Sequence, residues 1–217
     1  MPAATRPQRT QVERRAETRA KLLDATIESI LEVGYAQTTT RRVAELAGVS
    51  AGAQAHHFPR RVELVAAAAE QLVDRRIEDG RRRAKRIGGA PQARLTALLD
   101  LLWADFASPI FAVFMKLWVA AADEPDLYQR LVTSERRLAR AVTDLASEAL
   151  GDLVAGEEGE RKLLLVFSAC RGLALTHQFE PRAHRRRDQW PQLREQLVSV
   201  LAPPERDRRR RAPRPAP

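Results

Sequence analysis

The feature that most constrains the fold of this chain is one stretch, TTTRRVAELAGVSAGAQAHHF, at residues 38–58. Its first half predicts a short helix that Thr39 can cap and that Gly48 can end in a left-handed turn. Apolar residues at near-helical spacing support this helix: Val43, Ala44, Leu46 and Ala47. Ser50 can then cap a second short helix over residues 51–57. The stretch therefore predicts two short helices joined by a tight turn.

The second of these helices has almost no bulk and almost no charge. This composition suits a helix that enters the major groove of DNA better than one buried in a core. The amide of Gln54 can pair with adenine, and His56 and His57 can donate to phosphate or to guanine. Ser50 and Ala51 begin the helix and are expected to lie nearest the groove floor. The alternative is that Gln54 faces solvent and that the two histidines only pack.

The first short helix offers a different kind of contact. Free N–H groups and the helix dipole attract anions at a helix N-terminus. Four residues lie there and are expected to contact DNA phosphates: Thr39, Thr40, Arg41 and Arg42. Such contacts fix the position of a protein on DNA without reading the base sequence.

A longer segment around these two helices resembles one protein family. The matching residues are Arg19-Ala-Lys-Leu-Leu-Asp-Ala25, Gly34-Tyr35, Ala47-Gly48-Val49-Ser50, His57-Phe58-Pro59 and Glu63-Leu64. In order and spacing, about 50 residues resemble the DNA-binding part of the tetracycline-repressor (TetR) family of bacterial transcription regulators. The resemblance implies a larger helical regulatory part, a homodimer, and a DNA-backbone contact at the position of His57.

The chain also departs from the pattern of that family. Ala55 stands where a tyrosine usually contacts the DNA backbone, and Gln54 replaces a common aliphatic residue. Arg61 takes the place of a frequent lysine. Arg42 occupies the third helical position, where an acidic residue would complete a capping box.

The net charge of +9 and the isoelectric point near 10.8 favour a polyanionic partner. Part of the excess is local, since residues 75–87 hold seven basic and two acidic side chains. The single cysteine, Cys170, excludes an intramolecular disulfide and fits a reducing cytoplasm. The N-terminus lacks the apolar core of a signal peptide, and no apolar run reaches the ~20 residues that span a bilayer. We therefore expect a cytoplasmic protein that makes no membrane contact.

The periodicity of the whole chain predicts an all-α protein with two main domains. We expect a flexible arm at residues 1–11, a three-helix DNA-binding domain at 12–60 with its motif at 39–58, a helical regulatory, ligand-binding and dimerisation domain at 61–202, and a disordered basic tail at 203–217. Helices are predicted at residues 61–86, 91–106, 109–122, 126–150, 160–179 and 190–201, with a loop at 151–159. No strand pattern, phosphate-binding glycine loop or catalytic grouping occurs, so neither an enzyme nor a cofactor is expected.

Most of the large side chains of the predicted second domain gather within residues 103–118. Core packing explains most of them, but some could line a cavity between helices, where helical bundles hold small molecules. The resemblance implies a small effector there, and the side chains favour an apolar or aromatic one. The candidate pocket residues are Trp103, Phe106, Phe111, Phe114, Met115, Trp118, Phe167, Cys170, Leu173 and His177, with Asp105 and Ser108 as further polar groups.

Cys170 and His177 lie two turns apart on one helical face. A zinc site would need two more ligands at suitable spacing, and the sequence does not supply them. An apolar helix gives Cys170 no reason for a lowered pKa, so we expect a buried thiol and no metal.

The last two predicted helices are more apolar than a monomer of this size would expose. Two copies that pair there would form a four-helix interface, as the resemblance implies. The residues expected in it are Phe167, Gly172, Ala174, Trp190, Leu193, Leu197 and Leu201. A dimer would add the contacts of two recognition helices on a palindromic site.

Together these patterns predict a homodimeric DNA-binding transcriptional regulator. We expect it to act as a repressor that leaves a double-stranded operator when an apolar or aromatic small molecule binds. Two alternatives stay open. One is a helical small-molecule-binding or enzymatic protein with a vestigial DNA-binding domain, and the other is a DNA-binding protein without an effector.

Overall fold

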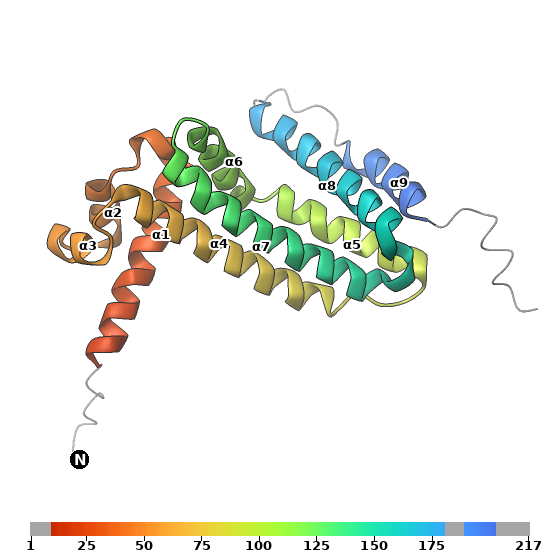
Figure 1. Ribbon diagram of the computed structural model, residues 1–217, viewed down its shortest axis with the longest axis horizontal. Helices are drawn as coiled ribbons and strands as arrows, with labels where there is room; N and C mark the ends of the chain where they lie inside the picture. Colours follow the sequence, from red (N-terminus) through yellow and green to blue (C-terminus); the bar gives the residue numbers. More distant parts are fainter. Residues whose placement is uncertain (1–9, 181–188, 203–217) are drawn as a thin grey trace, which may run out of the picture. The chain divides into compact units, whose positions relative to one another are not determined.

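The computed structural model of the chain describes residues 10–180 and 189–202 (Figure 1). Within these ranges the chain forms nine α-helices, one short 3-10 helix and no strand, which confirms the predicted all-α class. The elements are α1 (Gln11–Gln37), α2 (Thr40–Ala47), α3 (Ala51–His57), α4 (Arg61–Ala84), α5 (Pro91–Phe106), α6 (Pro109–Ala121), α7 (Pro125–Leu150), the 3-10 helix η1 (Gly151–Val154), α8 (Gly156–Phe179) and α9 (Trp190–Leu201). The predicted arm, apart from residues 10 and 11, and the predicted tail at 203–217 lie outside the described residues.

The chain divides into two compact units that differ from the predicted domains. Among the described residues, the first unit contains those up to Val73 together with Ala112–Glu135, and the second contains Asp74–Phe111 and those from Arg136 onward. The predicted boundary after residue 60 therefore falls inside the first unit. Three helices, α4, α6 and α7, contribute residues to both units.

The first unit is built around the middle of α1. Thr10 and Glu13 form a capping box that begins this helix, and Gly34 interrupts it with a φ of 80°. The apolar core of the unit lies where the part of α1 between the capping box and Gly34 packs against the neighbouring helices. It contains Leu22, Leu23, Ala25, Val43, Phe58, Leu64, Ala67 and Ala68.

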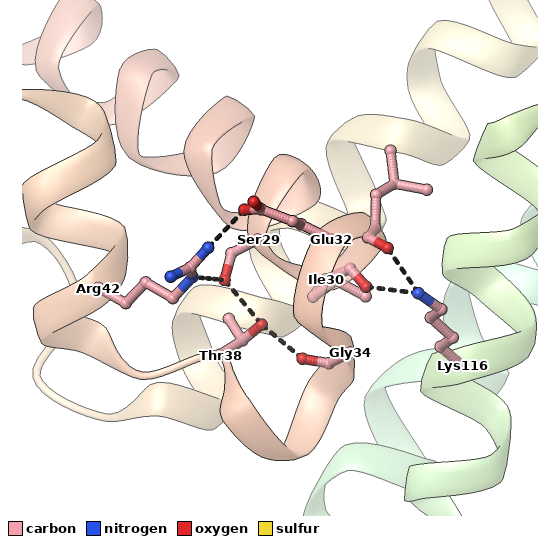
Figure 2. Close-up of polar contacts among 8 residues, drawn as sticks. Ser29, Ile30, Glu32, Gly34, Thr38, Arg42 and Lys116 are labelled. Atoms are coloured by element: carbon pink, nitrogen blue, oxygen red, sulfur yellow. Dashed lines mark hydrogen bonds and ion pairs between the residues drawn. The ribbon is translucent and has the colours of Figure 1, made fainter.

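Within the first unit, the segment Ala112–Glu135 is held by polar contacts with α1 and α4. Lys116 on α6 donates to the carbonyl oxygens of Ile30 at 3.1 Å and Leu31 at 2.6 Å. Figure 2 shows Lys116 pointing toward Ile30. Cations are favoured near the C-terminal end of a helix because its carbonyl groups point outward there. The hydroxyl of Tyr35 donates to Glu124, and the Arg61 guanidinium lies 4.1 Å from the centroid of the Tyr35 ring. These contacts tie a segment distant in sequence to the end of α1.

Within the second unit, hydrogen bonds and ion pairs connect α5 to α9 and to α4. Asp100 on α5 accepts from the indole N–H of Trp190 at 2.9 Å and from Arg194 at 3.0 Å. Asp105 accepts from Arg76 on α4, whose side chain is 7% exposed. The predicted loop at 151–159 instead holds η1 and the first turn of α8.

Within the described residues no single helix is long and apolar enough to cross a membrane. Helices α5 and α6 reach the length and composition of a span only as a pair bent at the break between them.

Candidate nucleic-acid interface

The capping residues predicted from the sequence shape the two short helices. The Thr39 hydroxyl accepts from the backbone N–H of Arg42 at 3.1 Å, and the Ser50 hydroxyl accepts from that of Ala53 at 3.2 Å. Gly48 ends α2 in the left-handed conformation, with φ 63° and ψ 35°. A side chain at this φ would be strained, so glycine is favoured. The predicted pair of helices joined by a tight turn is confirmed.

Helix α3 presents most of its residues to solvent. Ala51, Gly52, Ala55 and His56 are exposed, and Ala53 and His57 are partly exposed. Ser50, Thr39 and Arg41 are exposed beside it, and Thr40 is partly exposed. The exposed face of α3 itself carries only small and imidazole side chains, so it is free to approach another molecule.

Gln54 departs from its predicted role. Its side chain is only 5% exposed, and its amide nitrogen donates to the carbonyl oxygen of Phe58 at 2.8 Å. The side chain thus holds the end of α3 instead of facing a groove, so the base-reading role of Gln54 is replaced by a structural one. A buried amide needs such a partner, because an unpaired polar group in a core costs free energy.

Replacing Gln54 by alanine should lower the free energy of unfolding by about 1–3 kcal/mol, because the Phe58 carbonyl loses its partner. The base preference of the protein, measured by selection from random duplexes, should stay that of the wild type. Urea unfolding measures the first effect, and Ala55→Ser on the exposed face of α3 is the control. Wild-type stability combined with a changed base preference would restore the base-reading role.

Arg42 is held by α1 instead of pointing freely outward. Its guanidinium donates to the Ser29 hydroxyl at 3.2 Å and pairs with Glu32 (Figure 2). The Thr38 hydroxyl donates to the carbonyl of Gly34, so the Ser29 hydroxyl, 2.9 Å away, must donate its own proton to Thr38. This chain of hydrogen bonds fixes the start of α2 on the end of α1. We therefore treat Arg42 as a residue that positions α2, and we keep Thr39, Thr40 and Arg41 as the residues proposed to contact DNA phosphates.

Arg41 is better placed to exchange partners. It pairs with Glu45 one turn along α2 at 2.9 Å, and the two side chains are 88% and 65% exposed. Ion pairs this exposed contribute little to stability. A DNA phosphate can therefore replace the Glu45 carboxylate at small cost.

The N-terminal half of α1 adds two cations that the predicted site lacked. Arg15 and Arg19 are exposed, and the Arg19 guanidinium lies 5.3 Å from the centroid of the Phe58 ring, next to His57. Burial and the charges of Arg15, His56 and Arg19, in that order after burial, lower the pKa of His57. The spacing of four residues between Arg15 and Arg19 was the sequence signal for a shared helical face.

The structure brings two groups of the predicted pocket residues together in the second unit. The Trp103 ring stacks on Trp190 at 5.0 Å and meets His177 edge-on at 5.5 Å. The Phe106 ring meets Phe111 at 5.1 Å and Phe167 at 6.1 Å. Leu173 in the same unit is partly exposed, whereas Phe114, Met115 and Trp118 belong to the first unit, where Trp118 contacts Tyr128.

Cys170 is fully buried, and burial raises its pKa to about 11. At neutral pH the thiol is therefore protonated and a poor nucleophile, as the sequence predicted. In the parts of the chain that the structure describes, no three His, Cys, Asp or Glu side chains are grouped to hold a metal ion.

Four residues of the predicted dimer interface face the interior of their own chain. The exposed fractions are 1% for Ala174, 6% for Trp190, 4% for Leu197 and 1% for Leu201. They have almost no surface left to bury against a second copy, so this part of the prediction needs correction. Gly172 is exposed, and Phe167 and Leu193 are partly exposed. Leu164 and Leu165 on α8, which the prediction left out, are 68% and 51% exposed.

The geometry of residues 39–58 is that of a helix-turn-helix, with which DNA-binding proteins place a helix in the major groove. Residues 22–68 match the family model described as "Bacterial regulatory proteins, tetR family". The chain is 34% identical to the HTH-type transcriptional regulator CymR of Pseudomonas putida over 171 residues, which cover 77% of this chain and 82% of CymR. The chain therefore belongs to the TetR family of DNA-binding transcriptional regulators.

Solved structures share the fold at lower sequence identity. A transcriptional regulator from Rhodococcus sp. Rha1 superposes with a TM-score of 0.61 at 24% identity, covering 84% of this chain and 93% of the regulator. FadR from Bacillus subtilis, in complex with stearoyl-CoA, superposes with a TM-score of 0.62 at 16% identity, covering 84% of this chain and 96% of FadR.

Proposed function

We propose that the chain is a homodimeric repressor that binds a palindromic operator through α3. The exposed face of α3, together with the exposed Arg41 on α2 and the exposed Arg15 and Arg19 on α1, is the observation that carries this proposal. The small residues of α3 lie against base edges, and the flanking cations contact phosphates. The cytoplasm, where the DNA is, is the proposed location.

The sharpest test of the DNA contacts compares two exposed arginines. An operator is first selected from a library of random duplexes and its affinity is measured by fluorescence anisotropy at several salt concentrations. Arg41→Ala should weaken binding to all sequences alike and reduce the salt slope by about 1 per protomer, because one phosphate contact is lost. Arg86→Ala in the second unit is the matched control and should keep the slope. Equal slopes in both variants would remove Arg41 from the interface.

The homodimer is proposed to form through the exposed face of α8. Leu164 and Leu165 are the large apolar side chains left exposed among the described residues of the second unit. Ser168 and Gly172 follow Leu164 at spacings of four and eight residues and are exposed, and nothing lies within 4 Å of a Cβ built on Gly172. Small residues on the same helical face allow a second helix to approach closely. The proposed interface thus keeps Gly172, with Phe167 and Leu193 at its edge, and adds the two leucines.

We further propose that an apolar or aromatic small molecule, bound among the aromatic side chains of the regulatory part, releases the operator. FadR of the same fold was solved with stearoyl-CoA, whose stearoyl chain is apolar. The ligand can act only through different affinities for the DNA-bound and free conformations. Long-chain acyl and aromatic compounds added to the protein–operator complex should include one that lowers the anisotropy. If none of these compounds releases the DNA, the alternative of a regulator without an effector is favoured.

A further inference from the structure

His57 lies in a cluster of groups that carry or can carry positive charge. Its ring is 5.9 Å from that of His56, and the two rings meet edge-on at the end of α3. The charges of Arg15 and Arg19 on α1 act on His57, and the Arg19 guanidinium lies over the ring of the adjacent Phe58. Neither arginine forms an ion pair with any residue that the structure describes. The cluster therefore brings two arginines of α1 together with two titratable imidazoles of α3, and no carboxylate of the described residues pairs with either arginine.

We propose that this cluster is a phosphate-binding site that takes up a proton on His57 when DNA binds, so that DNA affinity rises as the pH falls. The proposal rests on the proposed function and adds the proton to it. A phosphate between α1 and the end of α3 would supply the missing anion. Its negative charge would favour the protonated imidazole, which has two N–H donors instead of one.

The electrostatics of the free protein support this proposal. The pKa of His57 is lowered from 6.5, first by burial and then by the charges of Arg15, His56 and Arg19. Helices α2 and α4 also lie next to α3 and carry charged side chains. None of these side chains is among the groups that shift the pKa of His57; they are Arg41, Arg42 and Glu45 on α2 and Arg61 and Glu63 on α4. His57 is therefore neutral in most free molecules at pH 7.

The direction of the effect follows from these charges. A phosphate opposes the repulsion from Arg15 and Arg19, so the pKa of His57 should be higher in the complex than in the free protein. Between these two pKa values the complex holds more protons than the separated molecules. Affinity must then increase as the pH falls through that window, by up to about tenfold per pH unit for each proton taken up.

The test measures the dissociation constant of the selected operator from pH 8 to pH 5.5 at constant ionic strength. The wild-type constant should fall with decreasing pH, and His57→Gln, which cannot take up the proton, should flatten this dependence. Arg15→Ala should make the dependence shallower near pH 6, because the pKa of His57 in the free protein rises toward that in the complex. Circular dichroism melts over the same range show whether each variant stays folded.

A second measurement follows the proton directly. The chain has four histidines, so the imidazole NMR signal of His57 can be assigned by its loss in His57→Gln. Its titration midpoint should lie below pH 6.5 in the free protein and move upward in the operator complex. Equal midpoints in both states, or the same pH dependence in His57→Gln as in the wild type, would overturn the proposal. Failure to select any operator would count against DNA binding itself, which separates the two proposals.

Discussion

Replacing both Leu164 and Leu165 by glutamate should separate the homodimer into monomers and weaken operator binding by about 100-fold or more. The two leucines are 68% and 51% exposed in the single chain. In a two-fold symmetric interface each leucine occurs twice, so the double substitution places four carboxylates on the contact. Each lost leucine removes about 1–2 kcal/mol of apolar burial, because only its exposed part is left to bury, and the carboxylates must also be desolvated. A monomer then contacts only one half-site.

Light scattering and sedimentation give the oligomeric state, and anisotropy gives the operator affinity. Val119→Glu is a suitable control, because Val119 is an apolar side chain 67% exposed on α6 in the first unit. This control should remain a dimer with the affinity of the wild type. A dimeric Leu164→Glu/Leu165→Glu variant would show that the α8 face is not the interface.

The second large effect concerns the core of the first unit. Leu23→Ala should lower the free energy of unfolding by about 2–5 kcal/mol, because it leaves a cavity in a fully buried site. Leu23 is 0% exposed and packs in the cluster that includes Val43 and Phe58, one from α2 and one from the end of α3. Loosening α1 should therefore release both short helices together, and operator binding should fail at a lower temperature than in the wild type.

Urea unfolding measures the change in stability, and anisotropy over a temperature series measures the loss of binding. Val12→Ala on the same helix is the control, since Val12 is 78% exposed and should change the stability by no more than about 0.5 kcal/mol. Wild-type stability in Leu23→Ala would mean that α1 does not support the helix-turn-helix from its core face.

The helix boundaries and caps of the DNA-binding motif could be predicted because their causes are local. Thr39, Gly48 and Ser50 act on backbone groups three or four residues away, so the sequence window contains both partners. Most helices of the second half were also predicted within a few residues, because apolar periodicity and prolines mark them. The TetR family followed from the same window.

The contacts that failed or were missed are those that depend on how whole helices pack. Gln54 and the Phe58 carbonyl are only four residues apart, but the sequence around them does not show that this side of α3 is the buried one. Arg42 forms an ion pair with Glu32 on α1, and nothing in the sequence around either residue indicates this pairing. On α8, the run Leu163–Phe167 is apolar on all sides, so periodicity cannot separate the buried Leu163 from the exposed Leu164 and Leu165.

The discontinuous first unit has a consequence for the construction of hybrid regulators. Lys116 and Glu124 reach α1 from a segment that begins almost forty residues after Val73. A chimera made by one crossover behind the helix-turn-helix would inherit the foreign counterpart of this segment, with no guarantee of a lysine for Ile30 or a carboxylate for Tyr35. Exchanging sensors between relatives of this chain therefore requires residues 112–135 to travel with the DNA-binding helices.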